Sequence, residues 1–170
     1  MGFLYFSPFF DGSYTFNIYG YNKHTTTNDF SKKILDSTFW PVSMDMLNAK
    51  INFINLDGKP LNINENITID YINHTHPNSA TSYRVCTDGH SVVYTTDCEH
   101  PVNSLNNNVI SIAQDADVLI HDSHFRHSEL EDYKGWGHSS WKKSIDVAKK
   151  ADVKKLCLFH YHPSYDDATV

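Results

Sequence analysis

The stretch Asp117-Val-Leu-Ile-His-Asp122 is a short aliphatic run that ends on an imidazole and a carboxylate. A run of this kind is typical of a buried strand. Two other runs have the same form: Ser91-Val-Val-Tyr-Thr-Thr96 leads into Asp97, and Lys155-Leu-Cys-Leu-Phe159 leads into His160. Ligands of open α/β sheets bind beyond the carboxyl ends of the strands. The three runs therefore predict an α/β fold with candidate site residues at one edge of a sheet.

The segments around these runs predict the other elements. Asp88-Gly89 separates two strand-like runs, which is a strong signal for a hairpin. Ser139 or Ser140 can cap a helix that precedes the last run, so that the second run, this helix and the last run form a β-α-β unit with parallel strands. Further strands are expected over residues 16–19, 51–56 and 67–72, and a further helix over residues 105–113.

Length and charge limit the kind of protein. A chain of 170 residues with 40% hydrophobic content is long enough for one domain with a real core and short for two. The formal charge of −6 gives no general attraction for phosphate backbones, and the sequence has no basic arm. Small or neutral substrates are favoured over nucleic acid on this ground.

The cysteines and the N-terminus indicate a compartment. Cys86, Cys98 and Cys157 are an odd set without a Cys-x-x-Cys pair, which favours reduced thiols and a cytoplasmic location. The apolar start has no basic region and is interrupted by Pro8, so it is neither a signal peptide nor a membrane span. We expect it to pack against another part of the protein.

Three residues next to predicted strands have the chemistry of metal ligands. These are His76, Asp97 and His160. Neutral imidazoles and carboxylates bind zinc, manganese or iron, and one carboxylate can bridge two metals. Each residue alone has an ordinary structural explanation, because a His before Pro is often in a loop and an Asp after a strand is often in a turn. Their joint occurrence with Gly135-Trp-Gly-His-Ser-Ser-Trp141 favours a functional site.

These motifs together resemble the metallo-β-lactamase superfamily. Asn73 to Arg84 with Ser91 to Glu99 is similar to its third and fourth metal motifs in the phosphodiesterase-like and tRNA-maturing branches, and three later segments are similar to later motifs of the same branches: residues 116–122, 137–139 and 156–163. The resemblance implies the C-terminal part of an αββα sandwich with mixed sheets flanked by helices. It also implies two divalent metals, zinc first with manganese or iron as alternatives. His76 would ligate one metal, Asp97 would bridge both and His160 would ligate the other.

The same resemblance gives roles to His138 and Asp122. In those branches a His in a Gly-His-Ser segment contacts the scissile phosphate or protonates the leaving oxygen, and an acidic residue orients it. A carboxylate partner fixes the imidazole tautomer and raises the pKa of the imidazole. His138 is therefore predicted as the proton donor and Asp122 as its partner, with a helix cap and a turn as the ordinary structural alternative.

Other candidates have weaker support. His74 could be the ligand in place of His76, and His162 is expected at the rim of the site. Cys98 directly follows Asp97, but adjacent side chains on an extended backbone point apart, so it is interpreted as packing. The remaining histidines are expected on exposed loops or helix surfaces: His24, His90, His100, His124 and His127.

The superfamily signature His-x-His-x-Asp-His is absent from the sequence. Residues 1–170 are therefore predicted to form a single incomplete domain that lacks the part with this signature and a last helix. Three remaining ligands cannot hold two metals in a closed geometry. We expect a hydrolase as the parent protein and an inactive chain with weak metal binding on its own.

The predicted function is that of a phosphodiesterase which uses a metal-bound hydroxide. The expected partner is a small-molecule or nucleotide phosphodiester substrate; no membrane is involved, and a homodimer is left open. One alternative is a hydrolase of a thioester, lactone or lactam on the same fold. Another is a domain that binds metal or a partner without catalysis. Maturation of tRNA is less favoured, because the chain is acidic.

Overall fold

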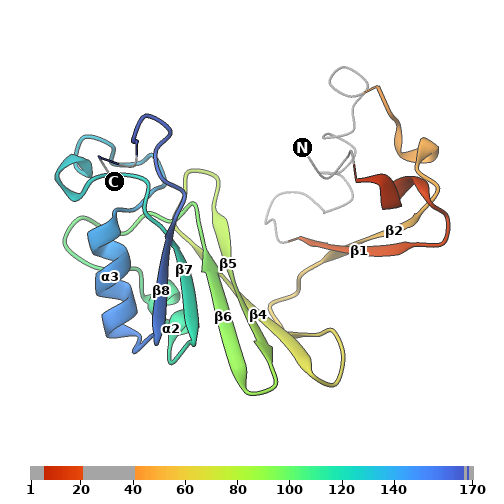
Figure 1. Cartoon of the computed structure of the whole chain (residues 1–170), viewed down its shortest axis with the longest axis horizontal. Coiled ribbons are helices and arrows are strands. Elements are labelled where there is room, and N and C mark those ends of the chain that lie inside the picture. The colour runs from red at the N-terminus through yellow and green to blue at the C-terminus, as the bar shows by residue number, and fades with distance from the viewer. Residues whose placement is uncertain (1–5, 21–40, 167, 169–170) are drawn as a thin grey trace. The chain divides into compact units, whose positions relative to one another are not determined.

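The computed structural model describes residues 6–20, 41–166 and 168 of the chain (Figure 1). The chain divides into two compact units, residues 1–57 and residues 58–170. Each unit has its own sheet. The expectation of one incomplete domain over residues 1–170 stays a prediction.

The first unit contains a two-stranded parallel sheet of β1 (Thr15–Gly20) and β2 (Lys50–Asn55). Both strands are predicted by the sequence, whereas their parallel pairing is not. Phe9 is buried, and its ring centroid lies 4.4 Å from that of Phe16 on β1. The apolar N-terminal segment thus contributes to the packing of this unit. Among its described residues it also contains two short 3-10 helices, η2 (Ser7–Phe10) and η3 (Met44–Met46).

The second unit is built on a six-stranded mixed sheet with the strand order β3-β4-β5-β6-β7-β8. Neighbouring strands from β3 to β6 are antiparallel, whereas β6, β7 and β8 are parallel. The carboxyl ends of these last three strands therefore meet at one edge. The strands are β3 (Leu61–Asn62), β4 (Ile67–His74), β5 (Ala80–Thr87), β6 (His90–Thr95), β7 (Val118–Asp122) and β8 (Lys155–Phe159).

The turn between β5 and β6 confirms the predicted hairpin. Thr87 pairs with His90, and only Asp88 and Gly89 lie between them. Their φ angles are 50° and 78°, so both residues are in the left-handed region. Two consecutive residues of this conformation form the turn whose twist matches that of the strands, and Asp-Gly is a preferred sequence for it.

Two α-helices with side-chain caps accompany the sheet. The Asn106 side chain accepts a hydrogen bond from the Asn108 N–H before α2 (Asn107–Ala113). The Ser140 hydroxyl accepts one from the Lys143 N–H before α3 (Trp141–Lys150), so Ser140 rather than Ser139 is the cap. Because β7 and β8 are parallel neighbours joined through α3, the predicted β-α-β unit is confirmed. A 3-10 helix, η4 (His127–Glu129), precedes α3.

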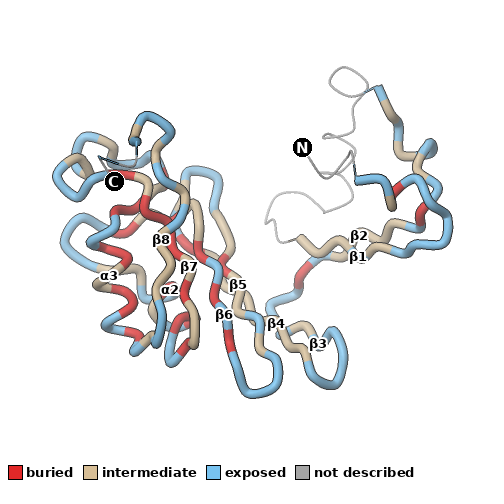
Figure 2. The backbone as a smooth tube through the Cα atoms, viewed as in Figure 1, coloured by how far each residue is buried: buried red, intermediate tan, exposed pale blue. Residues whose placement is uncertain are grey.

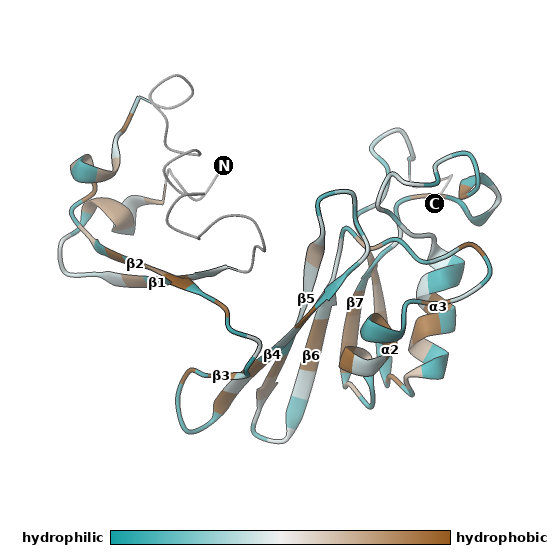
Figure 3. Ribbon diagram, turned by 180° about the vertical axis from the view of Figure 1, so that it is seen from behind, coloured by the Kyte–Doolittle hydropathy of each residue, from teal (hydrophilic) through white to brown (hydrophobic). Residues whose placement is uncertain are grey.

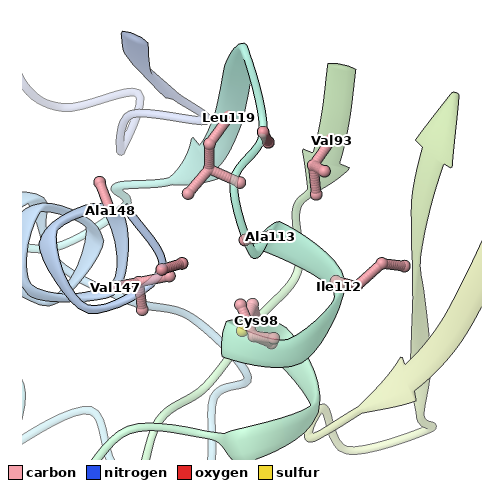
Figure 4. Close-up of a cluster of buried hydrophobic side chains, with 10 residues drawn as sticks. Val93, Cys98, Ile112, Ala113, Leu119, Val147 and Ala148 are labelled. Carbon is pink, nitrogen blue, oxygen red and sulfur yellow. The ribbon is translucent and has the colours of Figure 1, made fainter. Parts of the chain in front are cut away.

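The core of this unit lies between the sheet and its helices. Val93 of β6 and Leu119 of β7 pack with Cys98, Ile112 and Val147 (Figure 4). Along β6 every second residue is buried, so one face of the strand contributes to this core (Figure 2). The strands β5, β6 and β7 carry hydrophobic stretches, whereas α3 combines hydrophobic and hydrophilic residues (Figure 3). The mixed sheet flanked by helices agrees with the α/β class that the sequence predicts. In the described part of the chain, no helix has the length and apolar character needed to cross a bilayer.

A chain of buried imidazoles lies beside this core. The Asn106 N–H donates to His100 Nδ1 at 3.0 Å, which assigns the ring proton of His100 to Nε2. That nitrogen lies 3.2 Å from His121 Nε2, and His121 Nδ1 lies 2.8 Å from the Asp122 carbonyl oxygen. His100 was expected to be exposed and that prediction is wrong, since only 7% of its surface is accessible. The one ring N–H and the one acceptor nitrogen of neutral His100 therefore both have partners inside the protein.

Burial keeps these imidazoles neutral. It lowers the pKa of His100 to about 3, and it also lowers the pKa of His74 and of His121. In the unfolded chain the same groups take up protons near pH 6.5. Unfolding therefore binds protons below that pH, and acid favours the unfolded state.

We predict that the free energy of unfolding of the second unit falls as the pH is lowered from about 6.5 to about 4. Each buried neutral imidazole contributes about 1.4 kcal/mol per pH unit to this slope. Urea titrations followed by helix circular dichroism at several pH values measure it. His100→Gln should reduce the slope. His90→Gln should not, because the His90 side chain is 77% exposed. A slope that His100→Gln leaves unchanged would contradict the prediction.

Candidate metal and catalytic site

The ends of the three parallel strands bring the predicted polar residues together. Asp97 follows β6, Asp122 is the last residue of β7, and His160 follows β8 directly. The φ angles of Asp97 and His160 are 55° and 63°, so each is in the left-handed region, which non-glycine residues seldom adopt. His160 Nδ1 lies 3.7 Å from Asp97 Oδ1 and 3.2 Å from Asp122 Oδ2. Residues from three separate segments thus form one cluster.

The Asp122 carboxylate is the centre of this cluster. It is fully buried, and both of its oxygens face hydrogen-bond donors. Oδ1 accepts from two backbone N–H groups, and Oδ2 faces one backbone N–H and two imidazoles. The donors to Oδ1 are Ser139 N at 2.9 Å and His124 N at 3.2 Å; those to Oδ2 are His138 Nδ1 at 2.9 Å, Asp97 N at 3.0 Å and His160 Nδ1 at 3.2 Å. This carboxylate has no free lone pair directed at a metal, so it orients other groups.

The hydrogen bonds decide the charge states of Asp122 and His138. Burial by itself raises the pKa of Asp122, but the hydrogen bonds from His138 and the Ser139 N–H outweigh it and hold the pKa below its usual value. The hydrogen bond to Asp122 raises the pKa of His138, against a smaller opposite effect of burial. An ionised carboxylate therefore faces an imidazole that protonates readily. The structure places the predicted proton donor and its partner side by side.

Asp97 and His160 fit a metal ion. The Asp97 side chain is 45% exposed, and its Oδ1 lies 3.7 Å from His160 Nδ1. Because His160 Nδ1 donates to Asp122, Nε2 is the nitrogen of His160 that remains for a metal. Asp97, Asp122, His138 and His160 each offer a ligand atom within 4.8 Å of the others. Because the Asp122 oxygens are used, Asp97 and His160 are the residues of this group best suited to hold metal. Their roles as ligands stay predictions.

His76 lies beside His138. Its ring centroid is 5.9 Å from that of His138, in an edge-to-face arrangement. A Cβ atom on Gly137 would lie 2.2 Å from His76 Cδ2, so the His76 ring packs directly on this glycine. His76 is not in the 4.8 Å group of Asp97 and His160. Its assignment as a ligand therefore also stays a prediction.

The alternative ligand His74 is the last residue of β4 and is buried. Neither of its ring nitrogens has a hydrogen-bond partner among the described residues. Burial lowers the pKa of His74. A neutral imidazole with free nitrogens keeps the choice between His74 and His76 open.

The sequence analysis missed His124. It was expected to be exposed, but it is half-buried, and its ring stacks on that of His138 with 4.2 Å between centroids. Its Nδ1 lies 2.8 Å from the His160 carbonyl oxygen, to which it can donate. His124 thus supports both His138 and His160. The only sequence signal for this role is its position two residues after Asp122.

The other secondary candidates lie mostly as expected. Cys98 is buried in the hydrophobic core, which confirms packing. His162 is half-buried beside His124, with 5.0 Å between ring centroids, in agreement with the predicted rim position. His90 and His127 are exposed, and His24 lies outside the described residues.

Comparison with known proteins identifies the class. The family described as "Beta-lactamase superfamily domain" matches residues 28–161. The chain therefore belongs to the metallo-β-lactamase superfamily. It is 42% identical over 88 residues to "Ribonuclease Z" of Sulfurisphaera tokodaii, and 35% identical over 79 residues to "Ribonuclease Z" of Brevibacillus brevis. These matches cover 50% and 46% of the chain but only 27% and 23% of the two relatives, so the chain matches about a quarter of their length.

Solved structures show the same fold. The metallo-β-lactamase fold protein YhfI from Bacillus subtilis is similar over 93% of this chain and 57% of its own, with a TM-score of 0.68 at 24% identity. The short form of human tRNase Z is similar over 86% of this chain and 60% of its own, with a TM-score of 0.66 at 18% identity. The predicted fold class is thereby confirmed.

We predict that Gly137→Ala disturbs the site through His76. The added Cβ would overlap the His76 ring and force one of the two loops to move. Gly135→Ala is a matched control, since φ is 87° at Gly135 and 90° at Gly137, but a Cβ on Gly135 meets no atom within 4 Å. Both variants carry the same backbone strain. NMR resonances of the His76 and His138 rings should shift in the first variant only, and equal shifts in both would refute the steric explanation.

We predict that Asp122→Asn lowers the free energy of unfolding by about 2–4 kcal/mol. An amide keeps one acceptor oxygen but directs an NH2 group at donors, which leaves buried polar groups unsatisfied. Urea titration measures the change. Asp146→Asn on α3 should change it by less than about 0.5 kcal/mol, because Asp146 is 44% exposed and forms only a surface ion pair with Lys142. Similar losses in both variants would show that the Asp122 network is not stabilising.

Proposed function

We propose that this chain supplies part of the active site of a metal-dependent phosphodiesterase. The observation that carries the proposal is the Asp122 carboxylate, which holds His138 Nδ1 at 2.9 Å and His160 Nδ1 at 3.2 Å. Through it, a proton donor is fixed beside a metal-ligand side chain. Metal-assisted hydrolysis of a phosphodiester needs both kinds of group: ligands that hold the metal, and an acid that protonates the leaving oxygen.

Each residue has a role in this proposal. Asp97 and His160 would hold divalent metal, with His76 as a further ligand and Asp97 as the bridge; we expect zinc, with manganese or iron as alternatives. Metal held there would supply the chemistry of an activated water and of charge compensation on the phosphoryl oxygens. His138 donates a proton to the leaving oxygen. Because its Nδ1 is held by Asp122, Nε2 is the nitrogen that remains for this transfer.

The relatives support a phosphodiester substrate over the other bonds that this fold could hydrolyse. The matched relatives are named ribonuclease Z, and a ribonuclease cleaves the phosphodiester bonds of RNA. RNA is therefore a stronger candidate substrate than the formal charge of −6 alone suggests. A thioester, lactone or lactam substrate, or a binding role without catalysis, would be supported only if phosphodiesters were not cleaved.

We further propose that the 170 residues alone are inactive. No His-x-His-x-Asp-His segment occurs in the sequence, so the chain offers too few ligands for two metals. The proposed compartment is the cytoplasm, which agrees with the free thiols of Cys86, Cys98 and Cys157.

The proposal is tested with a chimaera that places the superfamily signature in front of this chain. With zinc or manganese it should hydrolyse bis-para-nitrophenyl phosphate, whereas the 170 residues alone should bind metal weakly and give no turnover. In the chimaera, His138→Ala should lower kcat by about a hundredfold or more, because a general acid is lost, while the metal content stays the same. His90→Ala, at an exposed position, is the control.

Three outcomes would count against it. Turnover of a thioester, lactone or lactam without turnover of the phosphodiester would support the alternative hydrolase. Loss of metal in His138→Ala would make His138 a ligand or a structural residue. Normal turnover by the 170 residues alone would refute their inactivity.

A further inference from the structure

Glu99 connects three loops at the site. Its backbone N–H donates to the Thr75 carbonyl oxygen at 3.0 Å. Its two carboxylate oxygens accept from a third segment: Oε1 from the Gly135 N–H at 2.9 Å and Oε2 from the Gly137 N–H at 2.8 Å. One residue thus makes three hydrogen bonds to two segments that are far from it in the sequence.

Each of these loops carries a residue of the proposed site. Thr75 precedes His76, Gly137 precedes His138, and Glu99 itself is two residues after Asp97. Because a hydrogen bond to a neighbouring peptide group fixes the direction in which the next side chain leaves the backbone, Glu99 sets the relative positions of all three loops. It does this without being directed at a metal or a substrate, since both of its oxygens are used.

The Gly135 to Gly137 segment needs such an external partner. Both glycines have φ near 90°, a conformation without the regular hydrogen bonds of a helix or a strand. Trp136 between them is 60% exposed, so its side chain anchors the segment only in part. A carboxylate with two acceptors suits two N–H groups spaced by one residue. The contact between Gly137 and the His76 ring tolerates little movement, because a single added carbon would overlap the ring.

We propose that Glu99 is a positioning residue that sets His138 against His76. The functions assigned to these two histidines rest on the proposed phosphodiesterase activity. The Glu99 clamp, by which we mean its three hydrogen bonds to Thr75, Gly135 and Gly137, does not depend on that activity. The Glu99 side chain acts through the Gly135 and Gly137 N–H groups, whereas the bond to Thr75 comes from its backbone, and Glu99 does not take part in the chemistry. Its length and its two acceptors are both required.

The test compares four variants of the full chain: Glu99→Asp, Glu99→Gln, Glu99→Ala and Glu131→Gln. Asp keeps the negative charge but does not reach both N–H groups, and Gln keeps the length but only one acceptor oxygen. Glu131 is an exposed glutamate near the same loop and serves as the control. Amide exchange of Gly135 and Gly137, measured by NMR, reports the clamp. A Co²⁺ titration reports the effect on the metal ligands.

In Glu99→Asp and Glu99→Ala, exchange of the Gly137 N–H should accelerate by about tenfold or more, with a smaller change in Glu99→Gln. Co²⁺ affinity should fall by about tenfold in Glu99→Asp, at the low end of the effect of supporting groups at metal sites, because Gly137 packs on the ring of the proposed ligand His76. Glu131→Gln should change neither. Wild-type exchange and affinity in Glu99→Asp would overturn the proposal, since charge alone would then be sufficient. A wild-type chain with protected amides but no Co²⁺ binding would contradict the proposed function and leave the clamp supported.

Discussion

A buried carboxylate must be surrounded by donors, and the site depends on how the Asp122 carboxylate meets this requirement. Removing an ionised carboxylate from water is costly unless hydrogen bonds replace the lost hydration. Here the replacements come from the loop after β6, from the segment that contains His138 and Ser139, and from His160 after β8. Satisfying one charge therefore forces these three loops into contact. The cluster of candidate functional residues is a consequence of that constraint.

The backbone carbonyl group of Asp122 is also held in place by neighbouring side chains. His121 Nδ1 lies 2.8 Å from the Asp122 carbonyl oxygen, and the Ser144 hydroxyl donates to this oxygen at 2.7 Å. Ser144 is on α3, so the helix of the β-α-β unit is linked directly to the end of β7. The core thus holds Asp122 rigidly, and Asp122 in turn holds His138. Orientation of a proton donor by a packed scaffold is the arrangement that precise catalysis requires.

Local patterns were sufficient to predict the elements that position the site. The runs ending at Asp122 and His160 became β7 and β8, and the Asp88-Gly89 turn and the Ser140 cap formed where turn and capping chemistry place them. Contacts between distant segments could not be predicted in this way. The burial of His100, the stacking of His124 on His138 and the clamp by Glu99 all depend on loops that meet only after folding. An isolated His or Glu in the sequence has no pattern that reports such a neighbour.

We propose that this chain binds metal at Asp97 and His160 rather than at the buried Cys98, His100 and His121. The two groups are chemically similar, because each combines imidazoles with an anionic or potentially anionic ligand. In the buried group, however, both ring nitrogens of His100 and both of His121 are engaged in hydrogen bonds, whereas in His160 only Nδ1 faces Asp122. A zinc-edge anomalous difference map from crystals soaked in zinc tests this most directly. We expect a peak within about 2.2 Å of side-chain ligand atoms of Asp97 and His160. A peak among Cys98, His100 and His121 instead, or none at Asp97 and His160, would contradict it.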